Sequence, residues 1–131
     1  MQKREPYASQ EEFNKRVTHY ADVPAVELGP GVNAHIVSAE RLTVTFATLA
    51  PSACAAVHHH EHEQIMVVVD GECDFILEGK LYPMSRGDVI VVPSNAEHGA
   101  YSSEKGCQIM DIFSPPRQDF VEKLKKALSS Q

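Results

Sequence analysis

Four histidines stand close together at positions 58, 59, 60 and 62 of this 131-residue chain. Alternate side chains of an extended segment point to the same face, so His58 and His60 share a face and His59 points away. Two imidazoles placed in this way can both reach one metal ion. A further histidine, His98, follows a later apolar segment that ends in a proline turn. These residues fit either one metal site or a polar hairpin tip, and by themselves they leave both open.

A second candidate group lies nearer the C-terminus, in the stretch QIMDIFSPPR. In a strand, Asp111 and Phe113 would share a face, and a carboxylate among apolar residues is costly to bury unless it is paired or functional. Arg117 follows closely enough to lie over the same end of the strand. The pattern indicates either an acid–base group beside an anion-binding arginine, or a structural Asp111–Arg117 salt bridge.

The elements that would position these groups are short apolar segments rich in β-branched residues. Glycine and proline turns separate them about every 8–12 residues, which predicts an all-β barrel or sandwich. A chain of 131 residues fits one domain, 1–131. Ser9 followed by Glu12 is a capping-box pattern, so a short helix is expected near the N-terminus.

A second helix is predicted near the other end, over about residues 115–128. Ser114 suits the N-cap and Pro115 the first helical position, where its missing N–H costs nothing. An apolar stripe at helical spacing would pack this helix on the barrel as a cover. The stripe consists of Phe120, Leu124 and Leu128.

The net charge of −6, without a long basic run, argues against nucleic acid or an anionic membrane as the main partner. No apolar run approaches the ~18–20 residues that span a bilayer, and the N-terminus has no apolar signal core, so we expect a cytoplasmic protein. The three cysteines form no CxxC pair, and we expect buried structural thiols. They are Cys54, Cys73 and Cys107.

Two motifs in the chain resemble those of the cupin superfamily. The first comprises His58, His60, Gln64 and Gly71, and the second comprises Gly87, Pro93, Asn95 and His98. The resemblance covers about residues 40–113. It implies a double-stranded β-helix, or jelly-roll barrel, in which the three matching histidines are metal ligands.

Gln64 stands where cupins normally place a glutamate ligand. An amide oxygen is a neutral ligand, so a divalent ion would keep its full charge and act as a stronger Lewis acid. Ligation through Glu63 instead would shift the strand by one residue and turn its core positions outward. His62 falls at the predicted turn, where a solvated or outer role is expected. Some cupins have lost their ion, so a metal-free site also stays open.

With the stretch DIFSPPR, the motifs resemble more specifically the small cupins of pectin and alginate breakdown, which process unsaturated monouronates. That resemblance implies one divalent ion (Zn, Ni, Fe or Mn) on three histidines and Gln64, with Asp111, Phe113 and Arg117 beside it. The implied activity is a non-redox, isomerase- or lyase-like opening of 4,5-unsaturated uronates to 5-keto-4-deoxyuronate. Asp111 would move the proton, and Arg117 would bind the carboxylate of this small anionic sugar acid.

Two other functions remain open on the sequence. One is a non-catalytic cupin that binds a small ligand, and the other is a metal-dependent dioxygenase. Oxygenases favour a redox-active iron site, often with a carboxylate ligand, which Gln64 makes less suitable here. Barrels of this size often pair through an edge strand or an N-terminal segment, so we expect a homodimer.

Overall fold

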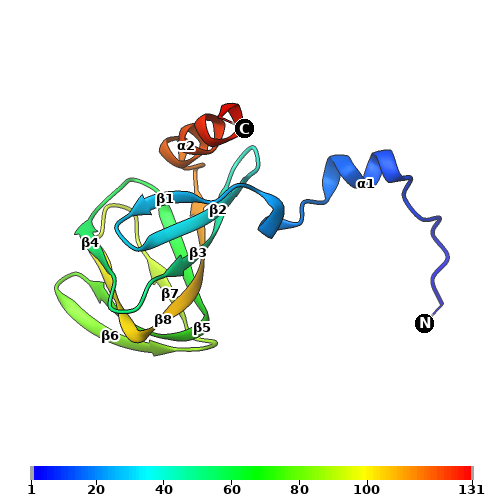
Figure 1. The fold of residues 1–131 in the computed structure, drawn as a ribbon. Helices are drawn as coiled ribbons and strands as arrows, with labels where there is room; N and C mark the ends of the chain where they lie inside the picture. The colour runs from blue at the N-terminus through cyan, green and yellow to red at the C-terminus, as the bar shows by residue number, and fades with distance from the viewer. Residues whose placement is uncertain (1, 131) are drawn as a thin grey trace.

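A computed structural model describes residues 2–130, and it shows a β-barrel with one helix packed against it and another projecting from it (Figure 1). The strands are β1 (Val26–Gly29), β2 (Val32–Ser38), β3 (Thr43–Leu49), β4 (Cys54–His58), β5 (Glu63–Leu77), β6 (Lys80–Ser85), β7 (Val89–Val92) and β8 (His98–Ser114). The helices are α1 (Gln10–Arg16), the short 3-10 helix η1 (Tyr20–Asp22) and α2 (Gln118–Ser129). The predicted all-β architecture with a helix near each end is confirmed.

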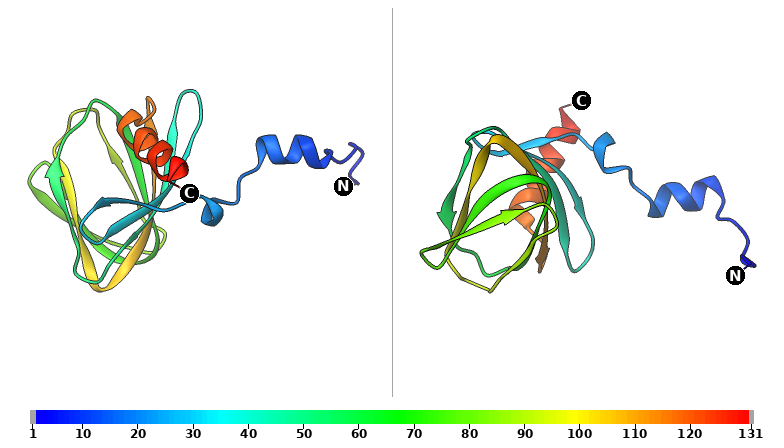
Figure 2. Two further views of the ribbon diagram at one scale, coloured as in Figure 1. Left: turned by 45° about the horizontal axis from the view of Figure 1, so that its top comes forward. Right: turned by 90° about the horizontal axis from the view of Figure 1, so that it is seen from below.

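All eight strands belong to one antiparallel sheet, whose main path runs β1–β2–β3–β8–β5–β6. Beside this path, β4 pairs with β8 and β7 pairs with β5. The two longest strands, β5 and β8, have 15 and 17 residues and pair with each other along most of their length. The sheet curls on itself and encloses an interior, as both views of Figure 2 show.

The register between β5 and β8 shifts on both sides of Gly71, the glycine of the first motif. Gly71 has a φ of +82°, and a Cβ at this position would lie 2.7 Å from the carbonyl oxygen of Gly106. Glycine alone permits this backbone conformation and this close approach without strain. The motif glycine therefore serves the crossing of the two long strands.

Apolar side chains from six strands form the core, and those of Leu49, Met66 and Val68 are almost completely buried. Cys73 and Cys107 belong to this core, as predicted. The same prediction is wrong for Cys54, which is exposed. Cys54 lies on β4, which pairs with β8 alone, so neighbouring strands cover its side chains incompletely.

The N-terminal helix α1 forms as its sequence predicts. The Ser9 hydroxyl accepts a hydrogen bond from the Glu12 amide, and the Glu12 carboxylate accepts one from the Ser9 amide. Residues 2–22 are all exposed, and α1 projects away from the barrel in every view (Figures 1 and 2). We refer to residues 2–17 as the arm. After it, Tyr20 stacks on Phe46 with ring centroids 4.1 Å apart.

The C-terminal helix packs on β1 and β2, but its predicted start is wrong. Ser114 is the last residue of β8, and its hydroxyl donates to the Arg41 carbonyl rather than capping a helix. The N-cap is Arg117, so the two prolines turn the chain before the helix begins. The stripe also differs from the prediction, since Leu128 is 50% exposed.

Between residues 2 and 130, the structure contains no helix of the length and hydropathy that crossing a membrane requires.

Candidate functional site

Three histidines from separate parts of the chain converge at one end of the barrel. His58 ends β4, His60 follows it in the connecting segment, and His98 begins β8. The pairing of β4 with β8 sets His58 directly opposite His98. One ligand atom from each of the three rings lies within 4.8 Å of the others. His59 is exposed, so the predicted alternation holds and brings the three expected histidines together.

A backbone carbonyl fixes the ring of each histidine. The Nδ1 atoms of His58, His60 and His98 lie 2.8, 3.0 and 2.9 Å from the carbonyl oxygens of Ala56, His62 and Ala96, respectively. A carbonyl oxygen only accepts, so each Nδ1 must carry the hydrogen and donate. The lone pair of each neutral ring is therefore on Nε2. This is the arrangement by which second-sphere partners orient metal-binding histidines.

Gln64 lies on β5 with its side chain buried among these rings. Its amide Nε2 donates to Asp111 Oδ1 at 2.8 Å, so its carbonyl oxygen faces the other way. That oxygen is 3.1 Å from His60 Nε2. With Nδ1 of His60 already donating, both facing atoms carry lone pairs. Glu63, the alternative ligand, is exposed on the opposite face of the strand.

The lone pairs of His60 and Gln64 require a positive centre between them. A proton on His60 would supply one, but burial, aided by the charge of Arg117, lowers the pKa of His60 to about 4. At neutral pH the imidazole is therefore uncharged. Burial also lowers the pKa of His98, and its buried Nε2 has no hydrogen-bond partner within residues 2–130. A divalent cation satisfies all of these atoms, so the residues fit a bound metal ion.

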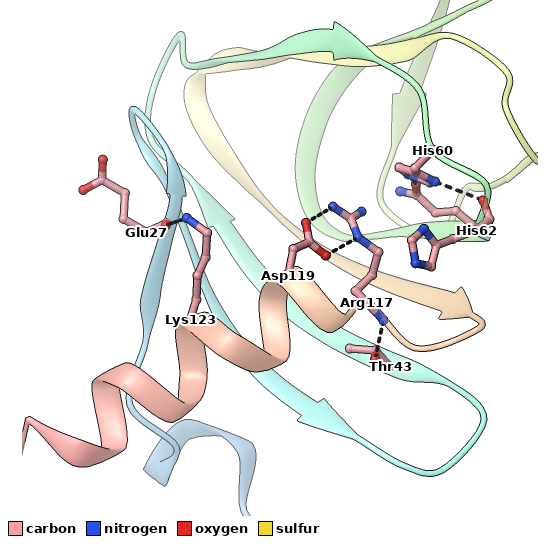
Figure 3. Close-up of polar contacts among 8 residues, drawn as sticks. Glu27, Thr43, His60, His62, Arg117, Asp119 and Lys123 are labelled. Atoms are coloured by element: carbon pink, nitrogen blue, oxygen red, sulfur yellow. Dashed lines mark hydrogen bonds and ion pairs between the residues drawn. The ribbon is translucent and has the colours of Figure 1, made fainter.

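His62 contributes its backbone rather than its side chain. It lies at the bend before β5, as expected, and its carbonyl accepts the hydrogen bond that orients His60 (Figure 3). The two imidazoles meet edge to face, with centroids 5.2 Å apart. His62 therefore has the outer role that its place at the turn predicts.

Asp111 lines the cavity from β8 and is buried, with 7% of its surface exposed. Burial raises the pKa of its carboxyl group to about 6, against the opposing effects of the Gln64 hydrogen bond and the Arg117 charge. Thr45 lies opposite Asp111 on β3 and also lowers this pKa, although its hydroxyl falls outside full hydrogen-bonding geometry. A carboxyl group with a pKa near 6 can both donate and accept a proton near neutrality.

Arg117 is buried beside the same cavity, but the predicted alternative of an Asp111–Arg117 salt bridge is wrong. Its ion-pair partner is Asp119, which accepts from Nε at 3.0 Å and from Nη2 at 2.8 Å (Figure 3). The guanidinium also lies over the rings of Phe120 and Phe113, at 3.8 and 4.8 Å from their centroids. Its position is therefore fixed from several sides.

The sequence did not identify two of these contacts, Asp119 and Phe120. An acidic residue in the first turn of a helix is ordinarily explained by the helix dipole. The helical spacing of Phe120 predicts only a place in the packing stripe of the helix. Asp119 and Phe120 lie two and three residues after Arg117 in the sequence. This spacing predicts contact with Arg117 only if Arg117 is the N-cap of α2.

These groups line a cavity of about 520 Å³ between the barrel strands and α2. Apolar side chains make up much of its wall. The polar residues that line it include Thr45, His58, Gln64, His98, Asp111, Arg117, Asp119 and Lys123. A concave, mostly apolar site with a few convergent polar groups is typical of small-molecule binding.

The barrel and its histidine site define a class of protein. The cupin domain matches residues 45–113, more than half of the chain, and the chain belongs to the cupin family. Within that family it is 32% identical over 102 residues to the pectin degradation protein KdgF of Dickeya dadantii (strain 3937). The match covers 76% of this chain and 93% of that protein.

Solved structures give the same result. The structure of KdgF from Halomonas sp. matches with a TM-score of 0.70 at 33% identity, over 74% of this chain and 90% of that one. An RmlC-like cupin from Shewanella frigidimarina NCIMB 400 matches with a TM-score of 0.75 at 27% identity, over 80% and 95% of the two chains. The cupin barrel predicted from the two motifs is confirmed.

Proposed function

We propose that this cupin is a metal-dependent enzyme that opens 4,5-unsaturated uronates to 5-keto-4-deoxyuronate. The observation that carries the proposal is a cluster of three oriented imidazoles at a cavity whose wall also holds a neutral amide, a carboxyl group of raised pKa and a fixed arginine. The similarity to a protein named for pectin degradation supports this substrate class. A non-catalytic ligand-binding cupin and a metal-dependent dioxygenase are the outcomes against which the proposal is tested.

We assign the metal ligands as His58, His60, Gln64 and His98, around one divalent ion (Zn, Ni, Fe or Mn). Bound in this neutral set of ligands, the ion acts as a Lewis acid toward a substrate oxygen. Gln64 has a second task, because its amide holds the carboxylate of Asp111 at 2.8 Å. The same side chain therefore joins the metal site to the acid–base group.

Asp111 is the residue that moves the proton. Opening the ring of a 4,5-unsaturated uronate releases the ring oxygen as an enol, and a carbon gains a proton when the enol becomes a ketone. No redox change occurs, since the product is an isomer of the substrate. Asp111 is suited to this transfer because a pKa of about 6 lets the carboxyl group exchange a proton in either direction near neutral pH.

Arg117 binds the substrate carboxylate, and Phe113 forms the apolar wall beside it. Asp119 already occupies the Nε and Nη2 donors of the guanidinium. The hydrogens that point away from Asp119, on Nη1 and Nη2, remain to receive a carboxylate. Asp119 therefore orients the guanidinium for substrate and is a positioning residue.

We further propose that residues 1–131 form one domain, and that the protein is a cytoplasmic homodimer. The core formed by strands from β2 to β8 supports the single domain.

The proposed function is tested by incubating the metal-loaded protein with unsaturated galacturonate under argon. We expect the absorbance of the ring double bond to decay faster than without enzyme, together with about one divalent ion per chain by elemental analysis. Binding without turnover would leave the non-catalytic cupin. Turnover that requires oxygen, with measurable oxygen uptake, would establish the dioxygenase instead.

A further inference from the structure

Two cationic side chains line the cavity, and Arg117 alone has a role in the proposed function. The other is Lys123, which lies on α2 beyond the Arg117 N-cap. Within residues 2–130, no further lysine or arginine lines this cavity. At about 1.5 Å per residue, the Cα atoms of Arg117 and Lys123 are about 9 Å apart along the helix axis. The cavity therefore has two separate places at which an anion can bind.

The ammonium group of Lys123 is not neutralised by an acidic side chain. Its Nζ lies 3.4 Å from the backbone carbonyl oxygen of Glu27, while the Glu27 carboxylate points away from it (Figure 3). The ion pairs found among residues 2–130 involve Lys15, Arg117 and Lys125, and none involves Lys123. One carbonyl uses one of the three ammonium hydrogens. The positive charge and two donors of Lys123 thus remain for a ligand.

The cavity wall beside Lys123 is apolar. Because Lys123 reaches Glu27 on β1, the next residues along the chain, Leu28 to Pro30, form the wall there. Phe120, which lies one helical turn before Lys123, lines the same cavity. A sugar ring presents C–H groups to such a wall and a carboxylate to the cation. This combination suits a ring that carries a carboxylate.

A monouronate leaves much of this cavity unused. It has about a dozen non-hydrogen atoms, whereas cavities of about 300–1,000 Å³ hold drug-sized ligands. The cavity here has about 520 Å³. A monouronate also carries one carboxylate, which the proposed function assigns to Arg117. Nothing in such a ligand matches the second cation.

We propose that Lys123 forms a second carboxylate subsite, and that the cavity binds a diuronate, in which two uronate rings are joined by a glycosidic bond. This inference rests on the proposed function, which places the carboxylate of the first ring on Arg117. The second ring then lies beside Leu28 and Pro30 with its carboxylate on Lys123. Cations about 9 Å apart suit carboxylates on two linked rings, since one carboxylate cannot span them.

An unsaturated diuronate bound in this way is an inhibitor rather than a substrate of the proposed isomerisation. Opening the monouronate ring breaks the bond between C1 and the ring oxygen, and the free hydroxyl on C1 becomes the aldehyde. In the diuronate the glycosidic bond replaces that hydroxyl, so the aldehyde cannot form. The reaction that supplies the substrate must therefore be one that cleaves glycosidic bonds, and incompletely cleaved chains should compete for the cavity.

Binding is tested by calorimetry on the full-length protein with galacturonate and digalacturonate. Both probes are saturated, so they have no ring double bond and bind without turnover. Digalacturonate should bind at least about 10-fold more tightly, the effect of one further hydrogen bond to a charged group. Equal affinities, or no binding of digalacturonate, would overturn the proposal.

Substitution of Lys123 locates the subsite. Lys123→Gln removes the charge but keeps a donor for the Glu27 carbonyl, and it should bring the ratio of the two affinities to about one. Lys123→Arg keeps the charge and should retain most of the wild-type ratio. Lys125→Gln is the matched control, because Lys125 is exposed on the same helix, pairs with Glu122 and does not line the cavity. A wild-type ratio in Lys123→Gln, with reduced thermal stability, would show that Lys123 only ties α2 to β1.

Turnover of unsaturated galacturonate distinguishes this inference from the proposed function. Saturated digalacturonate should inhibit that turnover competitively, and Lys123→Gln should weaken the inhibition by about 10-fold. Absence of turnover in the wild type would refute the proposed function but leave the comparison of affinities standing. Normal turnover with equal affinities for the two probes would refute the second subsite alone.

Discussion

On parts of β5 and β8, the inner and outer faces carry the opposite of the usual side chains: polar residues point into the barrel and apolar residues point out. On β5 the polar Gln64 points inward and the apolar Ile65 points outward, and on β8 Asp111 and Ile112 repeat the arrangement. An antiparallel strand with one solvated face normally shows the opposite alternation. Farther along β5, Met66 and Val68 return to apolar-in packing. The reversal is therefore local to the segment that lines the cavity.

Residues that are adjacent in the chain therefore have different roles, according to the face of the strand on which they lie. A buried polar group is informative because its burial must be compensated, and here the compensation is the hydrogen-bonded site. An extended apolar surface is informative because its contact with water is unfavourable. Substitutions on the inner face should alter catalysis, and substitutions on the outer face of the same strands should leave it nearly unchanged. Variants of the inner face, each with a control, test this difference.

The largest effect is expected from His98→Ala. Loss of a buried ligand should empty the metal site and reduce turnover to the rate without enzyme, because the Lewis acid is lost with the ion. His59→Ala is the control, since His59 is exposed beside the same cluster, and it should keep both metal and activity. Elemental analysis and the absorbance assay measure the two properties. Full metal content in His98→Ala would remove His98 from the ligand set.

Asp111→Asn should reduce kcat by about 10²–10⁴. The asparagine oxygen can still accept from Gln64, so metal content should remain close to wild type. Met110→Leu, a volume-conserving change on the outer side of the same strand, should leave kcat within a factor of about two. If Asp111→Asn retains full activity, the proton is moved by another group.

The same substitution should stabilise the metal-free protein at neutral pH. Burial raises the pKa of Asp111 from 3.8 to about 6, so the folded state binds its proton more tightly than the unfolded state. The free energy of unfolding therefore falls as pH rises from about 4 to about 6, by at most about 3 kcal/mol in total at 1.36 kcal/mol per pKa unit, and this loss is complete at pH 7.

Chemical denaturation of the chelated wild type and of Asp111→Asn should show this difference at pH 7. The difference should shrink as pH falls from 6 toward 4, where the wild-type carboxyl group becomes protonated. Subtracting the two proteins at each pH cancels the opposite contribution of His60 and His98, whose lowered pKa values destabilise the fold as they become protonated. A constant difference between pH 7 and pH 4 would contradict the assignment.

Gln64→Glu should keep or increase metal binding while turnover falls by about 10–100-fold, the effect typical of altering a metal's supporting contacts. An added negative charge weakens the ion as a Lewis acid. It also replaces the amide donor of Asp111 with a second carboxylate, which should raise the pKa of Asp111 further. The pH–rate profile of a fully metallated variant would show that upward movement, and an unchanged profile with unchanged turnover would mean that the neutral amide is dispensable.

The smallest effects are expected at the carboxylate-binding end. Arg117→Lys keeps the charge but loses the planar donors, so KM should rise by about 10-fold with a smaller change in kcat. Asp119→Asn loosens the guanidinium without removing it and should raise KM less. Steady-state kinetics separates these cases. Loss of thermal stability in both variants, with KM unchanged, would assign the Arg117–Asp119 pair to the scaffold alone.

The grouping of the three histidines could be predicted from the sequence because most of its geometry is local. The alternation of a strand fixes which of His58, His59 and His60 point together, and strand parity also decides between Gln64 and Glu63. Tertiary pairing then needed only to bring His98 across from His58, as the cupin motifs implied.

The partner of Arg117 was not predictable in the same way. It depends on where the chain turns after Ser114 and where α2 begins, and two consecutive prolines leave that point poorly determined. A helix starting at Pro115 would have put Arg117 inside its first turn. With the helix starting at Gln118, Arg117 is the N-cap and lies beside Asp119. Cys54 is exposed because β4 pairs with β8 alone, and the amino-acid sequence does not show how many strands flank β4.

The three carbonyl groups that orient the histidines have a further consequence for how this site can change over evolution. Each carbonyl belongs to a residue only two positions from its own histidine, as Ala96 is from His98. Ring orientation is thus encoded in tripeptides and is insulated from drift elsewhere in the chain. A tripeptide transplanted onto another barrel of the same curvature should bring its ring already turned toward the centre. The Asp111–Gln64 contact spans 47 positions and lacks that portability, so altered chemistry should arise more readily there than at the ligands.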